Sequence, residues 1–427
     1  MPTAHQPLAQ AERLAYLYRV AGLFSSTLDL TSVLDRVMDE VIRATAAERG
    51  LVVLRRPDAT LDFAAARGLD QQTLNEPAFE VSRGVVERVL ASGKPLLTSD
   101  AQDEGWLASR RSVMVLGLRS ILCVPLLVRG QASGVIYVDN RLQAGIFSPA
   151  DLDLLCAIAT SATAAIENAR LYQLALQQGR MERELQLARE VQAGLLPQQM
   201  PHPAGWEFAA AWEPAREVAG DYYDFIPLGQ GKAQQLGVVI GDVSDKGMPA
   251  ALFMAVARST LRASLAQGAT PALAISQANH LLCANTASGM FISLFYGQLD
   301  PESGEFMYVN AGHNPPLWLQ AASGMLQELE SSGPILAVFD DTDYREHRLH
   351  LAAGDLLLLY TDGLTEAPGA DESEFGLERV HALLQQLSSQ PAAEITAALL
   401  EAVRAYSGSV AFDDITLVLV KRIKEDV

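Results

Sequence analysis

Four stretches of this 427-residue chain place an aspartate beside a glycine or a second aspartate, next to an apolar run of strand-like composition. The four stretches are Gly220-Asp221, Gly241-Asp242, Asp362-Gly363 and Asp413-Asp414. Acids at the ends of four candidate strands are not typical of a solvated surface, and if they converge they repel one another. Carboxylate oxygens with water suit hard cations such as Mg²⁺ or Mn²⁺. The pattern therefore predicts a site in which divalent cations compensate four clustered carboxylates.

The overall charge excludes several classes of partner. The formal net charge is −19, with 49% hydrophobic and 19% charged residues, so the chain can bury real cores but is a poor match for a polyanion. Affinity for nucleic acid and for anionic lipid depends mainly on cationic side chains. We therefore expect no nucleic-acid partner and no membrane partner, and no uninterrupted apolar run approaches the length of a membrane span.

Cysteine usage and the first residues indicate the compartment. Cys123, Cys156 and Cys283 are too few and too scattered for a disulfide framework or a zinc site, which favours a reducing environment. Residues 1–10 lack a cationic start followed by an apolar core, as a secretory signal would have. The expected localisation is cytoplasmic.

The first third of the chain predicts helices around a small sheet. Apolar residues recur at helical spacing over residues 11–46, with a break expected at Gly22 and residues 25–27, and Thr31 or Ser32 as the N-cap of the second helix. Two apolar runs, 120–128 and 133–139, flank a short Gly-containing turn and predict a hairpin. A long helix follows from Pro149.

The hairpin and the helix after it resemble the second half of a GAF domain. The resemblance is carried by Ile121-Leu122-Cys123-Val124-Pro125-Leu126, Gly134-Val135-Ile136-Tyr137-Val138-Asp139, Phe147 and Ala165-Ile166-Glu167-Asn168-Ala169. It covers residues 12–170 and implies an antiparallel sheet with flanking helices. Two roles stay open, a structural dimerising domain and a sensor of a small molecule, and the ligand residues are unknown.

Residues 171–200 predict a helical coiled-coil linker. Leu174, Met181, Ala188 and Leu195 recur every seven residues, while Gln178 and Gln192 interrupt the companion seam. The favoured interpretation is a dimer helix whose weak seam can change register. The alternative is a single helix that lies on its own domain.

The remaining chain alternates paired strands with helices. Its apolar runs predict two β-sheets packed together with helices outside, so that the whole chain is of the α+β class. Seven motifs resemble the PPM (protein phosphatase 2C-like) superfamily in its SpoIIE/RsbU branch. They are Gly220-Asp221-Tyr222-Tyr223-Asp224, Gly241-Asp242-Val243-Ser244-Asp245-Lys246-Gly247, Met290-Phe291, Asn310-Ala311-Gly312-His313-Asn314-Pro315-Pro316, Thr361-Asp362-Gly363-Leu364-Thr365-Glu366-Ala367, Phe375-Gly376 and Asp413-Asp414-Ile415-Thr416.

This resemblance implies residue roles in a domain that spans residues 201–425. It makes Asp221, Asp242, Asp362 and Asp413 catalytic metal ligands for two Mn²⁺ or Mg²⁺ ions, with the Val243 carbonyl contributing. Asp414 is the alternative to Asp413, because a pattern cannot choose between neighbours. The substrate-binding residues are unknown. Lys246 is interpreted as solvated, with a phosphate contact as the alternative, and His313 as part of a structural turn.

The resemblance also implies a function. It predicts a metal-dependent protein-serine/threonine phosphatase that a GAF domain regulates, acting as a homodimer through the GAF domain and linker helix. The implied substrate is a phosphorylated anti-sigma-factor antagonist of the STAS class in bacterial partner-switching signalling. The competing hypothesis is a non-catalytic GAF-containing scaffold that binds a STAS or anti-sigma partner.

Overall fold

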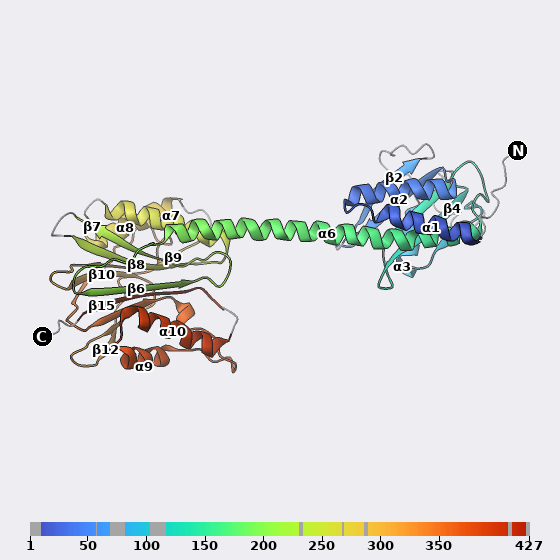
Figure 1. Cartoon of the computed structure of the whole chain (residues 1–427). Helices are drawn as coiled ribbons and strands as arrows, with labels where there is room; N and C mark the ends of the chain where they lie inside the picture. Colours follow the sequence, from blue (N-terminus) through green and yellow to red (C-terminus); the bar gives the residue numbers. More distant parts are fainter. Residues whose placement is uncertain are drawn as a thin grey trace. The chain divides into compact units, whose positions relative to one another are not determined.

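The computed structural model describes residues 10–56, 58–68, 82–102, 117–229, 234–266, 269–285, 289–408 and 412–423. The chain divides into two compact units, residues 1–180 and 181–427 (Figure 1). Nine of the ten residues on which the signal-peptide expectation rests, residues 1–9, lie outside the described part. The expected α+β class is confirmed, with an antiparallel sheet in the first unit and two sheets in the second.

The first unit is built on one five-stranded antiparallel sheet of order β2-β1-β5-β4-β3. The predicted hairpin is formed by β4 and β5, in which Cys123 lies opposite Tyr137. The strands are β1 (Arg49–Arg55), β2 (Leu61–Gly68), β3 (Leu96–Thr98), β4 (Ser120–Val128) and β5 (Gln131–Asn140), and the helices are α1 (Gln10–Phe24), α2 (Leu30–Thr45), α3 (Arg83–Ser92) and α6 (Pro149–Leu195).

Both faces of this sheet are covered, which explains why β1 is apolar at successive positions from Leu51 to Leu54. Side chains alternate across a strand, so Val52 joins the cluster with α1, α2 and the start of α6, while Leu51 and Val53 join the cluster with α3. A strand that is buried on both faces needs apolar residues at successive positions.

The helix boundaries correct two expectations. Gly22 lies inside α1, and the break falls at residues 25–29. The N-cap of α2 is Asp29 rather than Thr31 or Ser32, because the Asp29 carboxylate accepts hydrogen bonds from the backbone N–H of Ser32 at 2.8 Å and from its hydroxyl at 2.7 Å. An aspartate satisfies the free N–H groups of a first turn as well as serine does.

Helix α6 begins at a capping arrangement. The Ser148 N–H and hydroxyl both donate to Asp151 Oδ2, at 2.8 and 2.7 Å. Its early residues Leu155, Ile158 and Ile166 are buried in the first unit. Of the described helices, α6 alone is long and apolar enough to cross a membrane by length and composition, with a window of mean hydropathy 1.3 that is 39% buried within the protein.

The second unit contains two five-stranded sheets, of orders β12-β11-β14-β15-β6 and β13-β10-β9-β8-β7. Every pairing between neighbouring strands in them is antiparallel. The strands are β6 (Trp206–Glu213), β7 (Tyr222–Leu228), β8 (Gln235–Val243), β9 (Ile292–Leu299), β10 (Glu305–Ala311), β11 (Leu317–Leu319), β12 (Leu326–Glu328), β13 (His347–His350), β14 (Leu356–Tyr360) and β15 (Ile415–Arg422).

Two helix pairs enclose the sheets, which gives four layers. Figure 1 shows α7 (Met248–Leu265) and α8 (Pro271–Asn285) outside one sheet, and α9 (Leu377–Leu387) and α10 (Ala392–Ser407) outside the other. Strand β14 is buried on both faces. Leu357 and Leu359 belong to the cluster between the sheets, while Leu356, Leu358 and Tyr360 belong to the cluster with α9 and α10. The apolar run of β14 therefore follows from burial on both faces.

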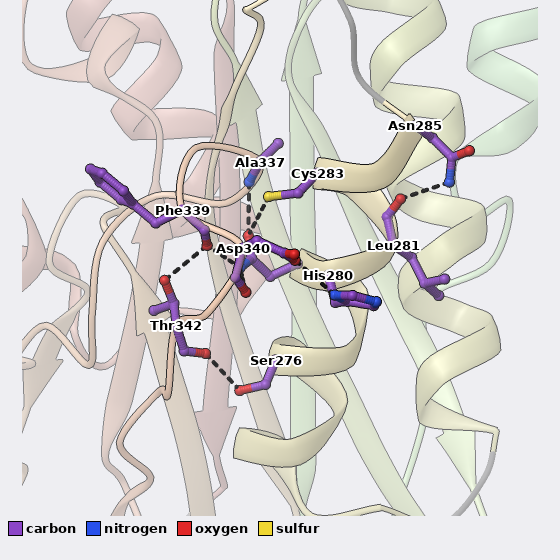
Figure 2. A network of polar contacts seen from close by, with 10 residues as sticks. Ser276, His280, Leu281, Cys283, Asn285, Ala337, Phe339, Asp340 and Thr342 are labelled. Atoms are coloured by element: carbon purple, nitrogen blue, oxygen red, sulfur yellow. Dashed lines mark hydrogen bonds and ion pairs between the residues drawn. The ribbon is translucent and has the colours of Figure 1, made fainter.

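A loop at residues 336–342 is tied to α8 by a polar network (Figure 2). The Asn279 side chain donates to the Phe339 carbonyl at 2.7 Å and accepts from the Ala337 N–H at 2.9 Å. His280 Nδ1 lies 2.7 Å from Asp340 Oδ1, and Ser276 donates to the Thr342 carbonyl. Ala337 is held in the left-handed region, at φ 68°.

Candidate metal centre

The four acid stretches come from paired strands in both sheets. Asp221 immediately precedes β7, and Asp242 lies near the end of β8, where Tyr222 pairs with Gly241. In the other sheet, Asp362 follows β14 and Asp414 precedes β15, and Thr361 N–H donates to the Thr416 carbonyl between them. The register thus places two acid stretches together at the end of each sheet.

Two threonines join the sheets at Asp221. This side chain is buried, at 1% exposure, and its Oδ2 accepts hydrogen bonds from Thr361 Oγ1 and Thr416 Oγ1, both at 2.7 Å. Burial, followed by repulsion from Asp242 and Asp414, raises the pKa of Asp221 well above its usual range. Both threonines lie in the predicted motifs, but the motif pattern alone indicates no role for them.

Asp242 titrates near neutrality in the absence of metal. Burial is the largest cause, repulsion from Asp362 comes next, and together with the other acids they raise the pKa of Asp242 to about 7. A hydrogen bond with Asp221 acts in the opposite direction and lowers the pKa of Asp242. The pKa of Asp362 is raised as well, first by burial and then by Asp413. The carboxylates therefore lie close enough for the charge of one to raise the pKa of another.

Asp413 and Asp414 have different surroundings. Asp414 accepts from two backbone N–H groups, Ala215 at 2.7 Å and Gly220 at 2.9 Å, so its carboxylate holds the segment before Asp221 in place. Asp413 accepts instead from Lys246 Nζ at 2.9 Å, and its side chain is 29% exposed. A carboxylate that is already committed to two N–H groups is less available to a cation.

Two glycines allow the chain segments to meet. A Cβ at Gly363 would lie 2.1 Å from the Asp414 carbonyl oxygen, and a Cβ at Gly220 would lie 2.8 Å from the Val243 carbonyl oxygen. Neither position can accept a side chain without a backbone shift. The second contact also places the Val243 carbonyl beside the segment that carries Asp221.

Sequence reasoning missed Glu366 and Gln192. Glu366 has a raised pKa, because of burial and then because of the charge of Asp362. Gln192, near the end of α6, is 4% exposed and forms two hydrogen bonds with the backbone of Ala219: its Nε2 donates to the carbonyl at 2.6 Å, and its Oε1 accepts from the N–H at 3.1 Å. The heptad pattern marked Gln192 only as a seam interruption.

His313 lies in a buried turn. Its N–H donates to Asn310 Oδ1 at 2.8 Å, its carbonyl accepts from Asn310 Nδ2 at 3.1 Å, and its Nδ1 lies 2.8 Å from Ser293 Oγ. Burial lowers the pKa of His313 to about 4, so the ring is neutral at physiological pH. This geometry agrees with the structural interpretation of His313.

The donor chemistry fits hard cations, although the side chains are not arranged as a finished site. Among the described residues no group of three or more His, Cys, Asp and Glu is placed to hold a metal ion. The hydroxyl groups of Thr361 and Thr416 donate hydrogen bonds to the Asp221 carboxylate. The Lys246 ammonium group forms an ion pair with Asp413. A cation would gain oxygen donors and relieve repulsion that burial otherwise makes costly.

The four layers and the acid cluster define the class of the second unit, a PP2C-like domain. The SiaA-PP2C domain of Pseudomonas aeruginosa has a similar structure, with a TM-score of 0.51 and 25% sequence identity over 58% of this chain and all of that one. Residues 232–423 match the family Stage II sporulation protein E (SpoIIE), and residues 29–166 match the GAF domain. The chain thus contains a region that matches the GAF domain, followed by a region that matches the SpoIIE family and has a PP2C-like fold.

Two curated relatives are similar to part of this chain. Protein IcfG of Synechocystis sp. is 32% identical over 266 residues, which cover 56% of this chain and 41% of that protein. The phosphoserine phosphatase RsbU of Bacillus subtilis is 28% identical over 247 residues, which cover 57% of this chain and 72% of that protein. The chain therefore spans less than half the length of IcfG.

Proposed function

We propose that this chain is a metal-dependent protein-serine/threonine phosphatase whose output is set by its GAF domain. One observation carries the proposal: acids from the ends of both sheets are buried close to one another. Burial and mutual repulsion raise the pKa of Asp221, Asp242 and Asp362. Such a cluster is costly unless it binds cations. The similarity to the phosphoserine phosphatase RsbU supports the same activity.

The proposed ligands are Asp221, Asp242, Asp362 and Asp413, with the Val243 carbonyl. Asp413 is preferred to Asp414, because Asp414 already accepts two backbone hydrogen bonds. Two Mn²⁺ or Mg²⁺ ions held there would lower the pKa of a water and orient it toward phosphorus.

The protein's own contribution is positioning. Thr361 and Thr416 fix the Asp221 carboxylate, and Asp414 fixes the backbone before it. Gly363 lets the segments of β14 and β15 approach closely enough to bring Asp362 beside Asp413. Together these contacts hold the backbone segments that carry the acids in place, so cation binding would require the side chains to rearrange rather than these segments.

The proposed substrate is a phosphoserine on a STAS-domain anti-sigma-factor antagonist, and dephosphorylation would release that antagonist to capture its anti-sigma partner. We further propose domain limits of 12–170, 171–200 and 201–425, and a homodimer through the GAF domain and linker helix. The linker carries exposed apolar side chains that a second copy could cover; they include Leu171, Leu174, Met181, Leu187 and Val191, which are 53–69% exposed.

Phosphate release from the purified full chain tests the activity. The assay uses Mn²⁺ or Mg²⁺, with a phosphoserine STAS protein and p-nitrophenyl phosphate as substrates, and compares wild type with Asp242→Asn. The control is Asp341→Asn, an exposed acid in the same unit. Metal-dependent release that Asp242→Asn abolishes and Asp341→Asn retains would support the phosphatase.

The scaffold hypothesis makes the opposite prediction. A chain that binds the STAS protein, binds metal and releases no phosphate from either substrate would be a non-catalytic binding partner. Equal STAS binding by wild type and Asp242→Asn, with equal and negligible release, would favour that alternative.

A further inference from the structure

A tight turn between β8 and α7 brings a lysine to the acid cluster. Asp245 and Gly247 both have positive φ, at 77° and 82°, and Lys246 lies between them. Its Nζ lies 2.9 Å from Asp413 Oδ2 and 5.7 Å from the centre of the Phe412 ring, while its side chain remains 47% exposed. The turn therefore points a cation at the rim of the cluster without burying it.

Lys246 also faces the neighbouring acids. Its charge acts against the rise in pKa of Asp362 and of Asp414. Glu366 adds a further carboxylate near Asp362 and Asp413. One ammonium group thus partly compensates several acids, which is the role that a metal ion would take over.

The surroundings of Lys246 would differ in the metal-bound protein. If Asp413 served as a metal ligand, its carboxylate would no longer be available to pair with the Lys246 ammonium group. Lys246 would then rest against Phe412 at the edge of the site, free to pair with an anion on a bound substrate. Helix α7 begins at the next turn, and its N-cap Gly247 provides no side-chain cap, so the helix N-terminus also favours negative charge there.

We propose that Lys246 is the residue that binds the phosphate group, and that its ion pair with Asp413 is the metal-free resting arrangement. The ligand class is a phosphoserine dianion or the inorganic phosphate product. The inference deepens the proposed phosphatase function and rests on it for the identity of the substrate. The Lys246 ammonium group lies over the face of the Phe412 ring, and the proposal retains this contact after the ion pair with Asp413 is broken.

Two binding measurements on the full chain test the proposal without turnover. Calorimetry of inorganic phosphate with the Mg²⁺-loaded protein should show about fivefold weaker binding for Lys246→Met than for wild type, the size expected of a half-exposed ion pair. Calorimetry of Mg²⁺ with the metal-free protein should show about twofold to fivefold tighter binding for Lys246→Met, because the competing ammonium group is gone.

Matched variants separate local from general effects. Lys94→Met makes the same charge change in the other unit and should match wild type in both titrations. Lys246→Arg should retain phosphate binding, and with a turnover substrate Lys246→Met should raise KM more than it lowers kcat.

Each contrary result is decisive. Equal phosphate affinity in Lys246→Met and Lys94→Met, or no phosphate binding by Mg²⁺-loaded wild type, overturns the phosphate role. Unchanged or weaker Mg²⁺ binding in Lys246→Met overturns the resting arrangement. Failure of the proposed function is distinguishable, because it would appear as wild-type protein that binds Mg²⁺ and phosphate in these titrations yet releases no phosphate from any substrate.

Discussion

Replacing Gln192 by alanine should reduce activity although this side chain touches none of the proposed ligands. Gln192 makes two hydrogen bonds to the Ala219 backbone, and the next residue, Gly220, donates to Asp414. Each net hydrogen bond contributes about 1 kcal/mol, so the pair holds the segment before Asp221 by about 2 kcal/mol. Because a tenfold change corresponds to about 1.4 kcal/mol, we expect kcat/KM to fall by up to about 30-fold.

The assay is Mn²⁺-dependent hydrolysis of p-nitrophenyl phosphate, combined with Mn²⁺ titration of each protein. Gln186→Ala is the matched control, since Gln186 is exposed on the same helix and in the same unit. Gln192→Glu should lie between wild type and Gln192→Ala, because glutamate can accept from the Ala219 N–H but cannot donate to the carbonyl. Equal kcat/KM for Gln192→Ala and Gln186→Ala would refute the reasoning, and a lower melting temperature with unchanged kcat/KM would limit Gln192 to a stabilising role.

Three further changes probe the second unit. Gly363→Ala should lower phosphate release at least tenfold, on the order of the cost of a misplaced catalytic group, because its Cβ would lie 2.1 Å from the Asp414 carbonyl; full activity would show that the backbone can yield there. Folding lowers the pKa of His313 from its ordinary value of 6.5 to about 4. Between these two pH values the unfolded chain binds more protons than the folded chain, so the free energy of unfolding should fall as the pH drops through this window. Chemical denaturation should show a loss of about 2 kcal/mol between about pH 7.5 and pH 5 that His313→Gln lacks; identical pH profiles would contradict the buried neutral ring. Ala337→Gly should raise stability by about 0.5–1 kcal/mol, measured by denaturation against Ala352→Gly, because glycine accepts φ 68° more readily than alanine; a loss equal to that of Ala352→Gly would contradict it.

The fold could be predicted from the sequence because its buried strands are continuous apolar runs. Leu356–Tyr360 is apolar at every position and is buried on both faces, and the acids follow such runs directly. Local patterns of this kind record burial, and the antiparallel pairing then brings the acid stretches to common ends.

The finer features of the site depend on contacts between distant segments. Asp413 and Asp414 are identical in type and adjacent, and what separates them is the Ala215 and Gly220 N–H groups, which lie about two hundred residues away in the chain, at separations of 199 and 194. Gln192 was misjudged for a related reason, since a polar residue in a heptad seam has the same local pattern whether it faces solvent, a second helix or a backbone. No periodicity distinguishes these cases.

Each unit has its own hydrophobic clusters, and this has a consequence for how the protein can evolve. The clusters of the first unit draw on residues up to Ala169, and those of the second begin at Leu196. A destabilising change in one core therefore leaves the other core's contacts intact, and calorimetry should resolve separate melting transitions. A different sensory domain could replace the first unit without any residue of the phosphatase core having to change, provided that the end of α6 and its Gln192 were kept.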